Sequence, residues 1–115
     1  DRVKFARAEG TLCAARALLL HALDEAMERT AQGDPIDGDT KAGLRLAATH
    51  AAWSSAEVVD VAYHLGGGAA LYDKSPLQRH FRDVHTMTQH IMVAEPTLKP
   101  IGRILLGLPT QTAQL

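Results

Sequence analysis

Apolar side chains recur every three or four residues along most of the chain, which is the spacing of one face of an α-helix. From residue 1 to about residue 32, the stripe consists of Val3, Ala6, Gly10, Cys13, Ala17 and Leu20, widened by Leu12, Leu19 and Leu23. The middle of this stripe consists of residues with small side chains, so a neighbouring helix can approach closely. The pattern predicts a long first helix that packs tightly but buries little apolar area per residue.

A second long helix is predicted after a short turn. Gly33, Asp34, Pro35, Asp37 and Gly38 are turn residues, and Asp39 or Thr40 can cap the following helix. This helix should run to about Leu65 and stop at three glycines, residues 66–68, because glycine adopts the left-handed conformation that ends helices. Its apolar face is formed by Leu44, Ala48, Ala51, Ser55, Val58, Ala62 and Leu65. Two long helices joined by a short loop should be antiparallel.

Ser75 and Pro76 are a start signal for a third helix, since serine can cap and proline fits the first turn. Leu77, Phe81, Val84, Thr88 and Ile91 form one stripe of it, and His80, Asp83, Met87, His90 and Ala94 form a second. A final short helix is expected from Ile101, Ile104, Leu105 and Leu108, ended by Pro109. The sequence therefore predicts an all-α fold, an up-down four-helix bundle.

Composition excludes several classes of partner. The chain has 12 Lys and Arg against 13 Asp and Glu, so it lacks the basic field that nucleic acids or anionic lipids require. No segment approaches the roughly 20 apolar residues of a membrane helix, so we expect a soluble protein. Cys13 is the one cysteine, which excludes an internal disulfide and fits a reducing cytoplasm; we expect it to be a small buried residue.

No metal site is predicted. His80, His85 and His90 are five residues apart, so each step rotates the side chain by about 140° around the helix. Asp60 and His64 are four apart, but two ligands make an incomplete site. His50 and Trp53 share a helical face, for which packing against a neighbouring domain is the favoured interpretation over catalysis.

The segment from Gly66 to His90, GGGAALYDKSPLQRHFRDVHTMTQH, carries a specific resemblance. It is similar to the flavin-facing part of the acyl-CoA dehydrogenase C-terminal domain. The histidine after RDVHTMTQ, and the lack of a glutamate base in the following segment, resemble the flavin-dependent monooxygenase branch. Since the chain begins with Asp1 and enters a helical pattern at once, we expect it to be the last domain, residues 1–115, of a longer three-domain enzyme.

The resemblance implies roles for particular residues. The glycine turn, with Gly67, Gly68 and Ala69, would contribute to a flavin pocket, and Arg82 of the RD pair would stand at an intersubunit or interdomain contact near the cofactor. His90 would face the reactive edge of the flavin as the catalytic residue. From the residues alone, the glycines are a chain reversal, Arg79 and Asp83 form a solvated ion pair, and His90 is an ordinary hydrogen-bonded histidine.

The resemblance also implies the reaction and the partners. A separate reductase would supply reduced flavin, FMN more often than FAD, and a flavin hydroperoxide would oxygenate an aromatic or sulfur-containing small molecule. The imidazole of His90 could donate a hydrogen bond to that hydroperoxide or accept a proton from a phenolic substrate. The assembly would be a homo-oligomer, a tetramer in this family.

Two alternatives stay open. An acyl-CoA dehydrogenase needs a carboxylate base, for which Glu95 is the nearby candidate, although it precedes Pro96 and not the glycine-threonine-glutamate context of those enzymes. A non-catalytic helical oligomerisation module would explain the small-residue seam of the first helix.

Overall fold

The computed structural model is an arrangement of four α-helices and describes residues 1–68, 76–112 and 115. The elements are α1 (Arg2–Ala31), α2 (Gly38–Leu65), α3 (Pro76–Thr88), the 3₁₀ turn η2 (Glu95–Thr97) and α4 (Leu98–Leu105). No strand occurs in the described ranges. The prediction of an all-α, four-helix fold is confirmed.

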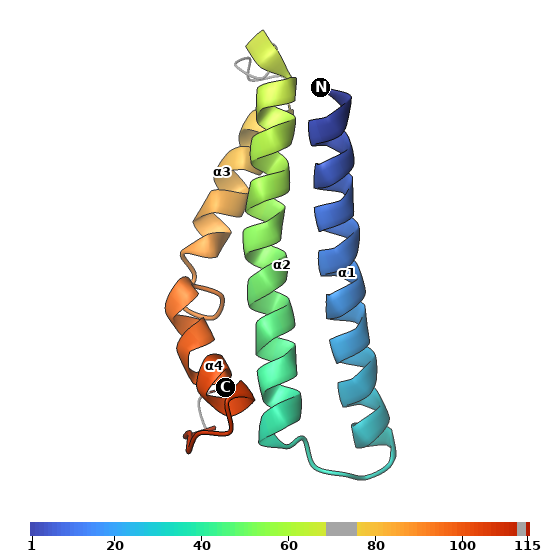
Figure 1. Cartoon of the computed structure of the whole chain (residues 1–115), viewed down its shortest axis with the longest axis vertical. Helices are drawn as coiled ribbons and strands as arrows, with labels where there is room; N and C mark the ends of the chain where they lie inside the picture. Colours follow the sequence, from blue (N-terminus) through green and yellow to red (C-terminus); the bar gives the residue numbers. More distant parts are fainter. Residues whose placement is uncertain (69–75, 113–114) are drawn as a thin grey trace.

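Helix α2 is the central element (Figure 1). It runs antiparallel to α1 on one side and contacts α3, η2 and α4 on the other. The molecule is elongated, 51 × 25 × 24 Å. The N-terminus lies beside the end of α2 that leads into the glycines, and α4 lies at the opposite end of α2. Every other helix is therefore positioned by its contact with α2.

The turn between α1 and α2 is fixed by two charged side chains. Asp37 has an extended backbone, and its Oδ1 accepts a hydrogen bond from the Thr40 N–H at 2.8 Å, so it caps α2. Arg29, in the last turn of α1, donates to the Pro35 carbonyl at 3.2 Å and pairs with Asp37 at 3.3 Å. The prediction that Asp39 or Thr40 caps α2 is wrong, because the cap is Asp37, two to three residues earlier, and the helix begins at Gly38.

The core between the long helices is built mainly from alanine. Ala15, Ala22 and Ala26 of α1 are buried, as are Ala42, Ala47, Ala52 and Ala56 of α2. The predicted face of α1 is wrong: Val3 is 60% exposed, and Cys13 is also exposed. Cys13 and the buried Ala15 are two residues apart, which is about 200° around a helix. Because small residues occur around much of α1, their spacing did not select one face.

Helix α2 is buried on more than one face because it has neighbours on two sides. The predicted stripe from Leu44 to Ala62 is half-buried, whereas the fully buried positions also include Thr49 and Ser54. Thr49 is 1% exposed, and its Oγ1 has no hydrogen-bond partner among the described residues. Two-sided packing explains why a single stripe did not describe this helix.

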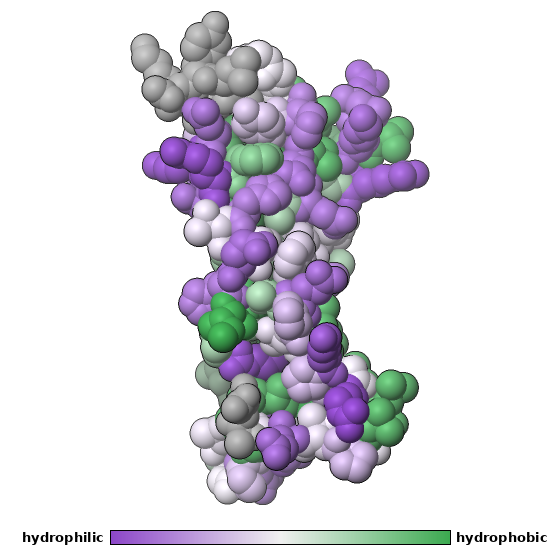
Figure 2. Space-filling model, turned by 90° about the vertical axis from the view of Figure 1, so that its left-hand side faces the viewer, coloured by the Kyte–Doolittle hydropathy of each residue, from purple (hydrophilic) through white to green (hydrophobic). Residues whose placement is uncertain are grey.

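Helix α4 contacts α2, and its buried residue is Ile101, which is 1% exposed. The helix ends at Leu105, and Gly107 takes a left-handed φ of 73°, so the expected extension through Leu108 to Pro109 is wrong. Arg103 Nη2 donates to the Pro109 carbonyl at 2.7 Å and fixes the chain after α4. Figure 2 shows the face formed by α3 and α4, with hydrophobic side chains emerging in its lower half.

None of the helices in the described part of the chain is long and apolar enough to cross a membrane.

Candidate functional site

His90 lies just beyond α3, in a turn, and not on the helix. The last regular residue is Thr88, whose Oγ1 donates to the His85 carbonyl at 2.7 Å. The next two amides bond three residues back, Gln89 N to Thr86 O and His90 N to Met87 O, which tightens and ends the helix. The prediction that His90 and Ala94 continue a stripe of α3 is therefore wrong. Ile91, assigned to the other stripe, is 82% exposed.

The imidazole of His90 is bound by its own turn. Nδ1 accepts a hydrogen bond from the Met92 N–H at 3.1 Å. The side chain is exposed, and Nε2 has no hydrogen-bond partner in the parts of the chain that are described. One nitrogen is thus held by the backbone while the other is free to meet a ligand.

The turn from Gln89 to Ala94 is held against α2 by two side chains. Arg45 Nη1 lies 3.2 Å from the Met92 carbonyl and 3.3 Å from the Met92 sulfur. Trp53 Nε1 donates to the Val93 carbonyl at 2.9 Å. Trp53 was expected to pack on a neighbouring domain, and this hydrogen bond within the chain was not predicted. An indole N–H near a packed surface needs a partner, but that partner lies 40 residues away and nothing in the sequence indicated it.

A surface hollow of about 440 Å³ lies beside this turn. Its walls come from α2, the turn, η2, α4 and the C-terminal residues. They are formed by Arg45, Ile91, Met92, Pro96, Thr97, Pro100, Gln111 and Leu115. Glu95, the candidate base of the alternative dehydrogenase, is exposed in η2 and lines a different hollow with Pro96, Leu98 and Lys99.

The glycines after α2 have distinct environments. Gly66 closes the helix, its N–H bonded to the Ala62 carbonyl, and a Cβ there would lie 2.7 Å from Leu77 Cδ1. Gly67 has a φ of 56°, in the left-handed region. A Cβ on Gly67 or Gly68 would meet none of the described residues within 4 Å. Ala69, also assigned to the cofactor, falls outside the described residues.

Arg82 lies on α3 and is exposed. Its guanidinium makes no ion pair with any residue that the structure describes, and Arg79 does not pair with Asp83. The expected solvated ion pair between these two residues is therefore wrong. Arg82 is available to a group from outside this chain.

The predicted site residues are not gathered in one pocket. Gly67 and Gly68 precede α3, Arg82 is in its middle, and His90 follows its end. The 13 residues of α3 correspond to about 20 Å of helix. The glycine turn and His90 therefore lie near opposite ends of α3, along one edge of the molecule.

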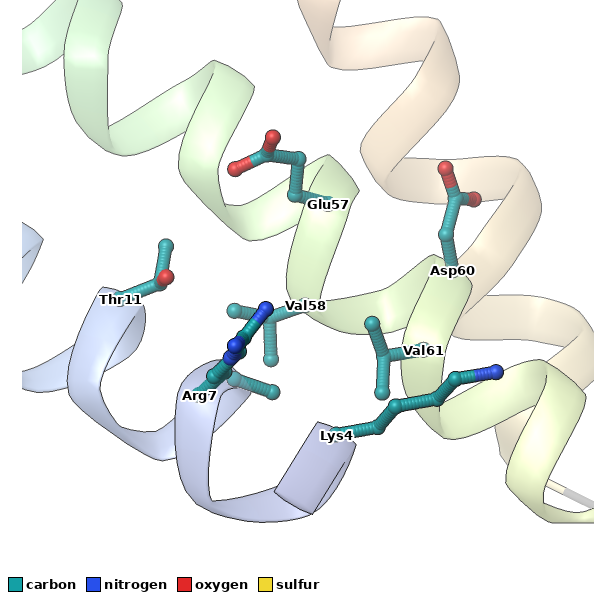
Figure 3. A pocket seen from close by; sticks show the side chains of 8 residues that line it. Lys4, Arg7, Thr11, Glu57, Val58, Asp60 and Val61 are labelled. Carbon is teal, nitrogen blue, oxygen red and sulfur yellow. The ribbon is translucent and has the colours of Figure 1, made fainter. Parts of the chain in front are cut away.

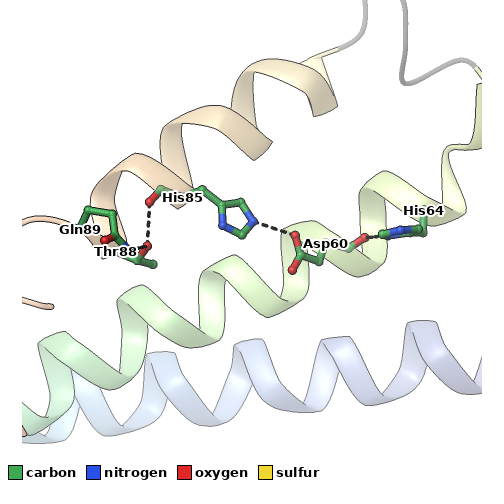
Figure 4. Close-up of polar contacts among 5 residues, drawn as sticks. All are labelled: Asp60, His64, His85, Thr88 and Gln89. Carbon is green, nitrogen blue, oxygen red and sulfur yellow. Dashed lines mark hydrogen bonds and ion pairs between the residues drawn. The ribbon is translucent and has the colours of Figure 1, made fainter. Parts of the chain in front are cut away.

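A polar contact that sequence reasoning missed joins α2 to α3 (Figure 4). His85 Nε2 and Asp60 Oδ1 are 2.8 Å apart, and His64 Nδ1 lies 2.7 Å from the backbone carbonyl of Asp60. The centroid of the Phe81 ring lies 4.5 Å from the centroid of the His85 ring and 4.8 Å from that of the Tyr63 ring. The side chain of Asp60 therefore links α2 to α3 through His85. No group of three metal-binding side chains occurs within the described ranges.

A second hollow, of about 310 Å³, lies between α1 and α2 (Figure 3). Lys4, Arg7 and Thr11 line it from α1, and Glu57 and Asp60 line it from α2. Cations and carboxylates are balanced there, so the hollow has no strong preference for one sign of charge. Asp60 also bonds His85, which directs its carboxylate toward α3.

Comparisons with known proteins give consistent results. The family model described as acyl-CoA dehydrogenase, C-terminal domain, matches residues 2–95. The chain is 37% identical over 106 residues to an indole-3-acetate monooxygenase of Pseudomonas putida, covering 92% of this chain and 27% of that protein. A protein of the same name from Acinetobacter baumannii is 30% identical over 105 residues, covering 91% and 27%.

A pigment production hydroxylase of Rhodococcus erythropolis is 33% identical over 84 residues, covering 73% of this chain and 21% of that protein. The chain thus spans about a quarter of the length of these curated relatives.

Proposed function

Because this chain belongs to the acyl-CoA dehydrogenase C-terminal domain family, we propose that it is the last domain of a longer three-domain flavoenzyme. The enzyme is a reduced-flavin-dependent monooxygenase that oxygenates an aromatic or sulfur-containing small molecule via a flavin hydroperoxide. The observation that carries this proposal is the likeness to proteins named monooxygenase or hydroxylase. Indole-3-acetate, named for two of them, is aromatic and supports that substrate class.

The residues present fit a flavin in three respects. No described residue lies within 4 Å of a Cβ built on Gly67 or Gly68, so a planar ring or a phosphate could approach this backbone without meeting them. Arg82 offers an unpaired guanidinium, the group best suited to a phosphate, within the described part of the chain. His90 offers a free Nε2. With Ala69, these residues would contribute to the binding of FMN, which we favour over FAD.

The bound flavin supplies the electrons and the activation of dioxygen. The residues of this chain bind and orient it, and His90 holds or moves a proton at the reacting centre. His90 is therefore the proposed catalytic residue, acting through the nitrogen that the turn leaves free.

The missing parts of the flavin and substrate sites would come from other chains or domains. We propose that the preceding domains of the same protein complete the pocket, that four copies assemble, and that a separate reductase supplies reduced flavin in the cytoplasm. The share of the relatives' length that this chain covers, 27%, supports the need for further domains.

The test uses the full-length protein that contains this chain, supplied with chemically reduced FMN, oxygen and indole-3-acetate as the aromatic probe. We expect oxygen uptake coupled to a hydroxylated product and a flavin absorbance spectrum on the purified protein. Bleaching of bound flavin by an acyl-CoA would instead identify a dehydrogenase. A purified protein with no flavin absorbance and no oxygen uptake on addition of reduced FMN would favour a non-catalytic oligomerisation module.

A further inference from the structure

The turn that carries His90 is held by hydrogen bonds to four consecutive backbone carbonyls. Each carbonyl from His90 to Val93 accepts at least one hydrogen bond. The donors are the Val93 and Ala94 amides to His90 O, Thr97 Oγ1 to Ile91 O, Arg45 Nη1 to Met92 O and Trp53 Nε1 to Val93 O, at 2.8 to 3.2 Å. A turn with no free carbonyl in this stretch has little freedom to rearrange.

Two of these donors come from one rigid element. Arg45 and Trp53 are eight residues apart on α2, about 12 Å along the helix axis. They bond adjacent carbonyls, those of Met92 and Val93. Helix α2 therefore orients the peptide that links Met92 to Val93 and the peptide that follows it. The Met92 N–H belongs to the preceding peptide, whose carbonyl, that of Ile91, accepts from Thr97 Oγ1 at 3.1 Å, so its direction is fixed between Thr97 and the two peptides held by α2.

That N–H determines the state of His90. It donates to Nδ1 at 3.1 Å, so Nδ1 must present its lone pair. A neutral imidazole with one accepting nitrogen carries its hydrogen on the other. Given the monooxygenase function proposed above, we infer that Arg45 and Trp53 are positioning residues. They hold His90 in the Nε2–H tautomer and make it a hydrogen-bond donor, not a proton acceptor, toward the oxygen chemistry.

The tautomer separates two chemical roles that the residue type alone leaves open. With hydrogen on Nε2, the free nitrogen can donate to an oxygen acceptor held against it, and it has no lone pair with which to take a proton from a phenol. Stabilisation of activated oxygen is therefore the role that the geometry selects for His90. Deprotonation of the substrate falls to another group.

The tautomer is directly measurable. In the full-length protein labelled with ¹⁵N-histidine, long-range ¹H–¹⁵N correlation spectra distinguish a nitrogen that carries hydrogen from one that does not. The His90→Gln variant identifies the His90 signals by their loss. At a pH where His90 is neutral, we expect hydrogen on Nε2 and a bare Nδ1. Hydrogen on Nδ1, or a mixture of both tautomers, would overturn the inference whatever the activity of the enzyme.

The positioning role is tested with Arg45→Met and Trp53→Phe, each of which removes donors while keeping most of the side-chain volume. Arg103→Met is the matched control, because Arg103 makes the same kind of bond to a carbonyl, that of Pro109, away from His90. We expect the two α2 variants to release about twofold to tenfold more hydrogen peroxide per product, the range that one lost hydrogen bond covers. Arg45→Lys, which keeps a donor, should restore part of the coupling.

Equal peroxide release in Arg45→Met, Trp53→Phe and Arg103→Met would overturn the positioning role, even if His90→Ala shows that His90 itself is required. A His90→Ala variant that oxygenates as well as the wild type would instead contradict the proposed function. In that case the ¹⁵N spectra of Arg45→Met and Trp53→Phe still decide the positioning role. Loss of the pure Nε2–H tautomer in these variants supports it, and an unchanged tautomer refutes it.

Discussion

The thiol of Cys13 donates a hydrogen bond to the Glu9 carboxylate at 3.4 Å, one helical turn earlier, instead of lying in the helix interface. This bond, together with the negative charge of Glu9, raises the pKa of the Cys13 thiol above its ordinary value. Both effects favour the protonated thiol, so less of the reactive thiolate is present at neutral pH.

We expect Glu9→Ala to lower the pKa of Cys13 in the 115-residue chain. The midpoint of the rate against pH for alkylation by iodoacetamide should then move to lower pH, and Cys13 should react faster at pH 8. Glu28→Ala, which removes a carboxylate from a distant turn of α1, is the control. An unchanged midpoint in Glu9→Ala would show that the hydrogen bond does not govern the thiol.

Gly67 and Gly68 differ from Gly66 in the contacts that an added side chain would make. Gly68→Val should leave the helices folded, because its Cβ meets no residue of the described ranges within 4 Å, but should weaken flavin binding in the full-length protein. Gly66→Val requires Leu77 to move and should lower thermal stability instead. Flavin titration and thermal unfolding of both variants make the comparison. If Gly68→Val binds flavin with wild-type affinity, Gly68 does not contribute to the flavin site and serves only the turn.

Sequence reasoning selected the glycine run and His90 as candidates, but could not give the surroundings of each residue. Which glycine is packed depends on Leu77 of another helix, and which nitrogen of His90 is free depends on the Met92 amide. Contacts of this kind are set by tertiary structure, which the local pattern does not contain. The roles assigned to Gly67, Gly68, Ala69, Arg82 and His90 stay predictions.

At the scale of elements, the start of α2 depends on Asp37. Hydrogen bonds from the Thr40 hydroxyl and N–H, with the nearby charge of Arg29, hold the pKa of the Asp37 carboxyl below its ordinary value. The resulting stabilisation is fully present above the ordinary aspartate pKa of about 3.9. It is lost as the pH falls through the lower value of the folded protein.

We therefore expect Asp37→Ala to lower the thermal midpoint of the 115-residue chain at pH 7, and this difference to shrink as the pH falls below about 4. Asp39→Ala is the matched control, since Asp39 lies in the first turn of α2 but does not cap it. Thermal unfolding followed by circular dichroism at several pH values gives the thermal midpoint of each variant. An Asp39→Ala variant that is less stable than Asp37→Ala would contradict the assignment of the cap.

The number, order and approximate bounds of the helices were predictable because spacing, capping residues and glycines are local signals. The buried face of α1 and the end of α3 were not. Alanine lies on several faces of α1, so packing against α2 selects the face at Ala15 and Ala22. Helix α3 stops at Thr88 without a glycine or proline, where α2 holds the following turn through Arg45 and Trp53.

At the scale of the whole molecule, many large apolar side chains remain uncovered. On α1 these are Val3, Phe5, Leu12, Leu20, Leu23 and Met27, and beyond α3 they include Ile91, Leu105 and Leu106. Scattered apolar residues are ordinary on a protein surface, but a dense set on one helix marks an interaction surface.

We expect the isolated 115-residue chain to self-associate at micromolar concentrations and to bind a hydrophobic dye. Analytical ultracentrifugation over a range of concentrations measures the first property, and dye fluorescence the second. Phe5→Ser combined with Leu20→Ser should weaken the association, whereas substitutions of the exposed charges Glu25 and Glu28 should not. A monomer at high concentration without dye binding would count against both the missing domains and the proposed tetramer.

The central claim is that His90 serves oxygen transfer in a flavin-dependent monooxygenase, and the fate of oxygen in His90→Ala tests it most directly. Product and hydrogen peroxide are quantified for the full-length enzyme with reduced FMN and indole-3-acetate. Product formation should fall by about 100-fold, the scale of one positioned acid–base group, with oxygen diverted to peroxide. His80→Ala and His85→Ala should remain much closer to the wild type. The same ratio of product to peroxide in His90→Ala and the wild type would contradict the claim.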